Sequence, residues 1–101
     1  MGLNGTYKVK MVTMGKEYEA EYFFETDEEG NLSGTLGAMG MKVILDRGSV
    51  TDTEFEGDAT SKSAMGKIPM KVTGTIDGDN ISGVIKPKIG GPSTFEGAKV
   101  Q

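Results

Sequence analysis

The sequence contains no cysteine, no histidine and no tryptophan, and each absence argues against a class of site. Without cysteine there are no disulfides and no thiolate ligands for a metal. Without histidine the chain lacks the commonest general base and the commonest metal ligand. Serine is present, but no S-x-x-K or G-x-S-x-G pattern places one beside a base or on a sharp turn. The residues therefore predict a protein that is not an enzyme and holds no cofactor.

Charge and hydropathy argue against two kinds of partner. Fifteen acidic residues against eleven basic ones give a net charge of −4, whereas nucleic-acid-binding domains carry an excess of positive charge. No apolar run approaches the length that spans a membrane. The first residues contain no apolar leader, so we expect a cytoplasmic protein. A length of 101 residues predicts a single domain, residues 1–101.

What the sequence does contain is a repeat. Met-Gly occurs at 14–15, 39–40 and 65–66, and a Gly-Gly pair follows at 90–91. The last residues of these four pairs are spaced by 25, 26 and 25 residues. Each period holds two runs of alternating apolar and polar residues, which is typical of successive strands. Acidic turn sequences lie between the Met-Gly pairs, at 27–30, 46–48 and 77–80. The chain is therefore expected to reverse alternately at a Met-Gly end and at an acidic end.

The register of the first hairpin can be predicted from parity, that is, from the rule that alternate residues of a strand face opposite sides of the sheet. With Met14-Gly15 as a two-residue loop, apolar residues pair on one face: Tyr7 with Tyr22, Val9 with Ala20, and Met11 with Tyr18. Opposite charges pair on the other face: Lys8 with Glu21, and Lys10 with Glu19. A slip of one residue would destroy both patterns, so this register is strongly favoured. The turn at 77–80 behaves likewise and pairs Ile76 with Ile81.

Eight antiparallel strands must hide their edges. Closure into a barrel achieves this, and eight strands enclose room for side chains or for one small ligand. The predicted fold class is all-β, an eight-stranded antiparallel up-and-down (meander) barrel of the lipocalin or streptavidin kind. A two-sheet sandwich is the structural alternative.

Two segments resemble the first hairpins of the avidin and streptavidin family. Gly5-Thr6-Tyr7 is similar to the family's G-x-W, and the run 30–36 (GNLSGTL) is similar to its G-x-L-x-G-x-Y. The wider pattern of Met-Gly turns, D-G turns and the F-E-G ending at 95–97 resembles small bacterial calycin-like barrels of unassigned activity. This resemblance implies a barrel fold. The biotin sites of the avidin family depend on tryptophans, and Tyr7 stands where the first would be, so no biotin-binding residue is implied.

The inward face is expected to be rich in aromatic and aliphatic residues. These are Tyr7, Tyr18, Tyr22, Phe24, Leu32, Leu36, Phe55, Ile68, Val72, Ile76, Ile81, Ile85 and Phe95. Inward glycines alternate with them at positions 34, 57, 74, 83 and 97, where they permit tight coiling and close packing of rings on backbone. Two interpretations follow. The rings fill the interior, or the glycines leave a narrow cavity with phenolic hydroxyls as polar groups.

Methionine shows the strongest asymmetry along the chain. Every methionine except Met1 lies within five residues of a Met-Gly tip: Met11, Met14, Met39, Met41, Met65 and Met70. An up-and-down barrel brings all six to one rim, where the adaptable side chains would form a hydrophobic plug, a ligand mouth or a protein-contact surface. Apolar residues that point outward by the same parity (Val12, Phe23, Ile44 and Val84) indicate a homodimer, a larger homo-oligomer or another partner.

Carboxylates provide weaker candidates for a site. Glu17, Glu19 and Glu21 share one strand face, but that face also carries the lysines and reads as solvated. Asp77, Asp79 and Asn80 lack the spacing of a calcium loop, so a hairpin turn is favoured and no metal is expected.

The leading functional hypothesis is a non-catalytic binding barrel. A small apolar or amphipathic ligand would enter at the methionine rim, and the candidate ligand-binding residues are Met11, Tyr18, Met39, Met41, Met70, Tyr7 and Tyr22. The second hypothesis is a structural module that oligomerises or docks onto an enzyme. An open interior would favour the first hypothesis, and a buried rim or barrel wall would favour the second.

Overall fold

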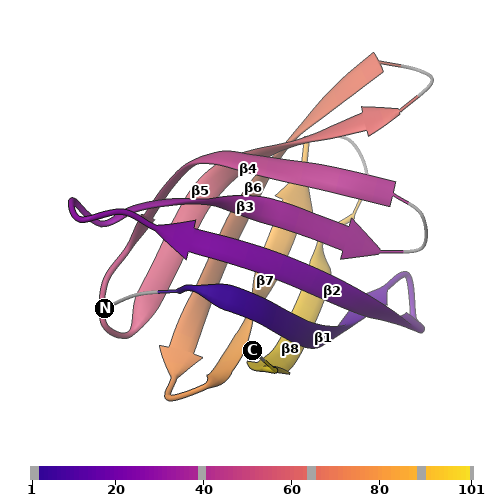
Figure 1. The fold of residues 1–101 in the computed structure, drawn as a ribbon. Coiled ribbons are helices and arrows are strands. Elements are labelled where there is room, and N and C mark those ends of the chain that lie inside the picture. The colour runs from indigo at the N-terminus through magenta and orange to yellow at the C-terminus, as the bar shows by residue number, and fades with distance from the viewer. Residues whose placement is uncertain (1–2, 39–40, 64–65, 89–90, 101) are drawn as a thin grey trace.

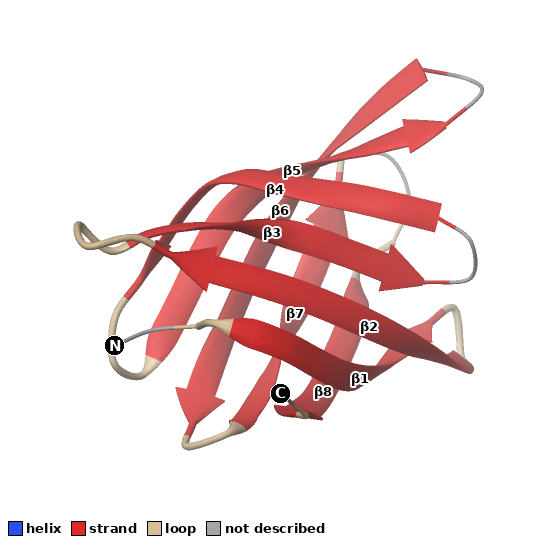
Figure 2. Cartoon of the chain, viewed as in Figure 1, coloured by secondary structure: helices blue, strands red, loops and turns tan. Residues whose placement is uncertain are grey.

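Eight strands make up almost the whole molecule in the computed structural model, which describes residues 3–38, 41–63, 66–88 and 91–100 (Figure 1). The first four are β1 (Gly5–Thr13), β2 (Lys16–Thr26), β3 (Asn31–Ala38) and β4 (Met41–Val50). The last four are β5 (Glu54–Ser63), β6 (Gly66–Asp77), β7 (Asn80–Pro87) and β8 (Ser93–Lys99). Figure 2 shows strands joined by short loops, and no described helix is long and apolar enough to cross a membrane.

The strands form a closed antiparallel meander. Each strand pairs with the next one along the chain, and β8 returns to pair with β1, so the described sheet has no free edge strand. This confirms the predicted barrel and excludes the two-sheet sandwich. The molecule measures 36 × 24 × 19 Å along its principal axes.

The first hairpin has the predicted register. Tyr7 pairs with Tyr22 across β1 and β2, and Lys8 pairs with Glu21. Met14 and Gly15 form the turn with φ of 52° and 79°, the two left-handed residues that a tight hairpin of this twist requires. The β6–β7 hairpin also matches, with Ile76 opposite Ile81. Parity was sufficient here because each hairpin has a turn of two residues.

The prediction of an acidic turn at residues 46–48 is wrong. Residues 46–48 lie inside β4, where the pairing with β5 shifts register between Leu45 and Arg47. The chain reverses later, at Thr51, whose backbone N–H donates to the carbonyl of Glu54 at 2.8 Å. A β-bulge breaks the apolar alternation and attracts turn-type residues, so the Asp-Arg-Gly sequence resembled a turn.

The core fills the barrel with rings and branched chains. Most of the predicted interior is buried, whereas Tyr18, Ile68 and Ile76 are only half-buried. Sequence parity missed four further buried residues: Leu3, Leu45, Ala59 and Ser61. Leu45 was hidden by the bulge beside it. Ala59 and Ser61 were missed because they are too small or too polar to produce an apolar alternation.

Aromatic rings occupy the space that the inward glycines leave. Phe24 contacts three rings, with centroids 5.6 Å from Tyr7, 6.0 Å from Tyr22 and 5.8 Å from Phe55. A Cβ on Gly74 would lie 2.6 Å from Cε1 of Phe55, so that ring packs directly on the glycine. In this part of the barrel the structure supports the filled interior over the open one.

The N-terminal segment closes the acidic end. Leu3 is fully buried, and its backbone N–H donates to Oγ1 of Thr26 at 3.0 Å. The Thr26 hydroxyl donates in turn to the Leu3 carbonyl at 2.7 Å, and the backbone N–H of Thr26 donates to Oδ1 of Asn4 at 3.1 Å. These bonds tie the start of the chain to the end of β2. A ligand site is therefore better sought at the opposite end.

Candidate functional site

The end of the barrel that carries the Met-Gly turns is the candidate site, here called the Met end. It consists of the ends of β1, β3, β5 and β7 and the starts of β2, β4, β6 and β8, on the right and upper right of Figure 1. The meander brings these eight strand ends together, as the repeat predicted. Met39 and Met65 lie outside the described residues, and so does the side chain of Met41.

The described methionines of this end differ in exposure. Met11 and Met70 are half-buried and pack against the core. Met14 sits at the tip of the β1–β2 turn with 94 % of its surface exposed. Met11 and Met70 therefore lie in contact with the core and with solvent, as lining residues of a mouth would.

The three tyrosines lie at different depths. Tyr18 pairs with Met11 and is half-buried at the Met end. Tyr22 is fully buried, with its ring centroid 5.4 Å from that of Phe95. Tyr7 lies near the start of β1, where burial and then the Asp79 carboxylate raise the pKa of its hydroxyl. Since Asp79 belongs to an acidic-end turn, the structure does not bring Tyr7 to the methionine rim. Tyr22 pairs with Tyr7 and is therefore equally far along the hairpin from the Met14-Gly15 turn.

Two buried hydroxyls have no hydrogen-bond partner in the described part of the chain: Tyr22 OH and Ser61 Oγ. Both residues are fully buried, and Ser61 lies near the Met end of β5, opposite Val43 and Ile68. Burial also raises the pKa of Tyr22 well above its ordinary value, so this hydroxyl stays protonated and can donate. An unpaired buried hydroxyl costs about 1–3 kcal/mol, which makes the pair the strongest indication of a ligand-facing site.

Two small buried residues lie on the same strands as these hydroxyls, two positions away on the inner face. These are Ala20, on the same strand as Tyr22, and Ala59, on the same strand as Ser61. Both are buried, at positions where other inward residues are large. Ala59 pairs with Met70, and Ala20 pairs with Val9. The inner wall toward the Met end thus carries these small residues and flexible methionines together with larger buried residues such as Ile85 and Phe95, whereas the acidic half contains Phe24, Phe55 and the Leu3 plug. Ser61 gave no signal in the sequence, because a single serine in a polar run resembles a surface position.

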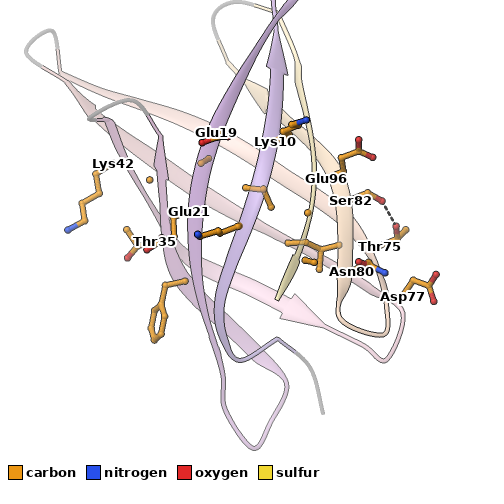
Figure 3. Close-up of a pocket in the computed structure, with 18 residues that line it drawn as sticks. Lys10, Glu19, Glu21, Thr35, Lys42, Thr75, Asp77, Asn80, Ser82 and Glu96 are labelled. Atoms are coloured by element: carbon orange, nitrogen blue, oxygen red, sulfur yellow. Dashed lines mark hydrogen bonds between the residues drawn. The ribbon is translucent and has the colours of Figure 1, made fainter. Parts of the chain in front are cut away.

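A groove with a volume of about 1390 Å³ lies on the outside of the barrel (Figure 3). Its floor is the outer wall of β1, β2 and β8, with Lys8, Lys10, Glu19 and Glu21 among its residues. Phe23 also lines it and is 42 % exposed, as its outward parity predicted. The groove is open and carries both signs of charge, so it has the character of a contact surface.

The carboxylates show no arrangement for metal binding in the part of the chain that the structure describes, where no group of three acidic side chains converges. The Asp27 carboxylate instead organises its own loop. It accepts hydrogen bonds from the backbone of Glu29 and Asn31, both at 2.9 Å, and from the Asn31 side chain. These bonds lower the pKa of Asp27, and the bond from the Asn31 side chain has the largest effect. The Asp27 carboxylate therefore has a structural role in this chain reversal.

Comparison with known proteins identifies the fold and no family. No family model matches the chain, and no curated protein matches it. Among solved structures, it is similar to a redesigned beta barrel, mFAP1, bound to DFHBI, with a TM-score of 0.76 and 17 % identity over 96 % of this chain and 94 % of that one. A second redesigned beta barrel gives a TM-score of 0.80 and 17 % identity over 98 % of this chain and 92 % of that one.

These likenesses support the small-barrel part of the resemblance and name neither avidins nor calycins. At this level of identity they concern the backbone arrangement alone. The chain is therefore placed by its architecture, as a small closed barrel of eight antiparallel strands.

Proposed function

We propose that this protein is a non-catalytic binding barrel that takes a small amphipathic molecule at its Met end. The observation that carries the proposal is the buried Ser61 Oγ near the Met end, which, like the deeper Tyr22 OH, has no hydrogen-bond partner in the described part of the chain. A ligand with one hydrogen-bonding group would satisfy a hydroxyl that the fold leaves unpaired. Met11 and Met70 would pack on its apolar body, and the half-buried Tyr18 lies beside Met11. A barrel of similar fold, mFAP1, is bound to DFHBI, which supports ligand binding by this architecture.

The proposal predicts that the neutral fluorescent probe N-phenyl-1-naphthylamine binds the wild-type protein with enhanced emission. Changing Met11→Gln together with Met70→Gln should weaken this binding about fivefold or more, because each amide is costly to desolvate against an apolar probe. Met14→Gln is the matched control, since Met14 lies at the same end but is 94 % exposed. Its affinity for the probe should not change. Fluorescence titration measures the affinity of all three proteins for the probe, and circular dichroism verifies that they are folded.

Absence of probe binding, or equal binding by the double variant, would contradict the ligand proposal. The second candidate function, self-association, would then take its place. It is favoured by the outer groove, where the Lys8 and Lys10 row on β1 runs beside the Glu19 and Glu21 row on β2. A two-fold axis between the rows would set lysines of one copy against glutamates of the other, as an isologous dimer requires.

The two unpaired hydroxyls lead to a separate stability prediction. Tyr22→Phe and Ser61→Ala should leave the free energy of unfolding unchanged or raise it by about 1 kcal/mol, because each removes a buried polar group that has no partner in the described structure. Thr26→Val is the control, since its hydroxyl is bonded to Leu3 in both directions. The free energy of unfolding of this Thr26→Val variant should fall by about 1–2 kcal/mol. Urea unfolding measures each value, and a loss above about 1 kcal/mol for Tyr22→Phe or Ser61→Ala would show that the fold itself uses that hydroxyl.

A further inference from the structure

Charge is segregated along the barrel, although the net charge is −4. The turns of the acidic end, residues 27–30, 51–53 and 77–80, contain no basic residue and six carboxylates: Asp27, Glu28, Glu29, Asp52, Asp77 and Asp79. The Met end has the opposite character. Among the side chains that the structure describes, six exposed lysines lie within five residues of its chain reversals: Lys10, Lys16, Lys42, Lys67, Lys86 and Lys88. Carboxylates within the same distance are Glu17, Glu19 and Glu96.

The two ends act as separate electrostatic surfaces. The strands that join the two ends hold from 7 to 12 residues and rise about 3.3 Å per residue, whereas charges are screened over about 8 Å at physiological ionic strength. A molecule approaching the Met end therefore meets a positive field, and the distant carboxylates do not cancel it. The chain as a whole is acidic, so this excess of lysine is a property of one end.

The positive end coincides with the candidate mouth. Ser61 is fully buried, its Oγ has no hydrogen-bond partner among the described residues, and it lies two residues before the Met-end limit of β5. Met11 and Met70 pack on the core at the same end. A hydroxyl inside, an apolar lip and a surrounding set of ammonium groups match one ligand chemistry. That chemistry is an apolar body with an anionic group.

We propose that the ligand of this barrel is a small anionic amphiphile, a carboxylate, sulfonate or phosphate monoester on an apolar body. This inference rests on the proposed function. The apolar body lies between Met11 and Met70, while the anionic group stays at the lip, where the lysines are hydrated and need not be buried. An anion held at the lip avoids the large cost of desolvating a charge inside the barrel.

The test compares two probes that share one apolar body. N-phenyl-1-naphthylamine is neutral, and 8-anilinonaphthalene-1-sulfonate adds a sulfonate to the same ring system. We expect the wild-type protein to bind the sulfonate roughly fivefold or more tightly than the neutral probe at low salt, with the advantage lost at high salt, because screened surface charges contribute little.

Matched variants locate the effect. Lys42→Gln with Lys86→Gln should weaken sulfonate binding roughly fivefold and leave the neutral probe unaffected. Arg47→Gln with Lys99→Gln removes two exposed positive charges away from the Met end and should change neither affinity. All four substituted positions are exposed, so the variants should keep the melting temperature of the wild type.

Failure of the anion inference and failure of the proposed binding function give different results. If the neutral probe binds as well as the sulfonate and the lysine variants have no effect, the anion inference is overturned and the binding barrel stands. If neither probe binds, the proposed function falls as well. If the protein fails to bind the sulfonate in solution but sediments with phosphatidylglycerol vesicles, the lysines serve a lipid surface and the inference is likewise overturned.

Discussion

Replacing Phe24 with alanine is expected to lower the free energy of unfolding by about 3–5 kcal/mol. Phe24 is fully buried and contacts the rings of Tyr7, Tyr22 and Phe55, so its removal leaves a cavity that three rigid neighbours cannot collapse to fill. The lost transfer energy and the residual cavity both contribute to this cost. Urea unfolding monitored by tyrosine fluorescence or circular dichroism measures it.

The adjacent residue provides the control for this prediction. Phe23 is also a phenylalanine of β2, but it faces the outer groove and is 42 % exposed. Phe23→Ala should cost less than about 1 kcal/mol, because little buried surface is lost. Similar losses for Phe23→Ala and Phe24→Ala would contradict the inside–outside assignment of β2.

Replacing Gly83 with valine is expected to destabilise the barrel by about 3 kcal/mol, the upper end of the usual cost of overpacking. A Cβ on Gly83 would lie 2.7 Å from Cα of Gly74 and 2.8 Å from Cζ of Phe95, and would collide with the carbonyl oxygen of Thr73. Two of these three obstacles are backbone, which cannot move without breaking the β6–β7 ladder. Denaturant midpoints of wild type and variant give the measurement.

A glycine on the other face of the wall is the matched control. Gly37 also lies within a strand, but a Cβ there would meet only the carbonyl oxygen of Glu21, at 3.4 Å. Gly37→Val should therefore change the free energy of unfolding by no more than about 0.5 kcal/mol. An unchanged midpoint for Gly83→Val would mean that the interior beside Phe95 is open, against the packing described above.

Parity in the sequence was sufficient for the parts of the fold that have tight turns. Tyr7 opposite Tyr22 and Ile76 opposite Ile81 follow from two-residue loops and period-two alternation. The bulge between Leu45 and Arg47 could not be foreseen, because one extra residue shifts the alternation and resembles a turn. Leu3 could not be foreseen as the plug of the acidic end, since its burial depends on the distant Thr26.

The candidate site was predictable in location and less so in composition. The Met-Gly repeat and the meander together predict one methionine-rich end, and Met11 and Met70 are found there against the core. The depth of each polar group depends on how the strands tilt around the barrel, which a sequence does not show. Tyr7 therefore proved to lie toward the acidic end, and Ser61 proved to be fully buried. The charge of the Met end also emerges only when eight strand ends are brought together.

Methionine methyl NMR can detect a small amphipathic molecule bound inside the Met end, as we propose. Titrating 13C-methyl-methionine protein with N-phenyl-1-naphthylamine should shift the Met11 and Met70 methyl signals and give intermolecular NOEs from both to the naphthyl ring. The exposed Met14 methyl should show no NOE to the probe. Unchanged Met11 and Met70 signals at saturating probe, or NOEs confined to residues of the outer wall such as Phe23, would contradict binding inside the barrel.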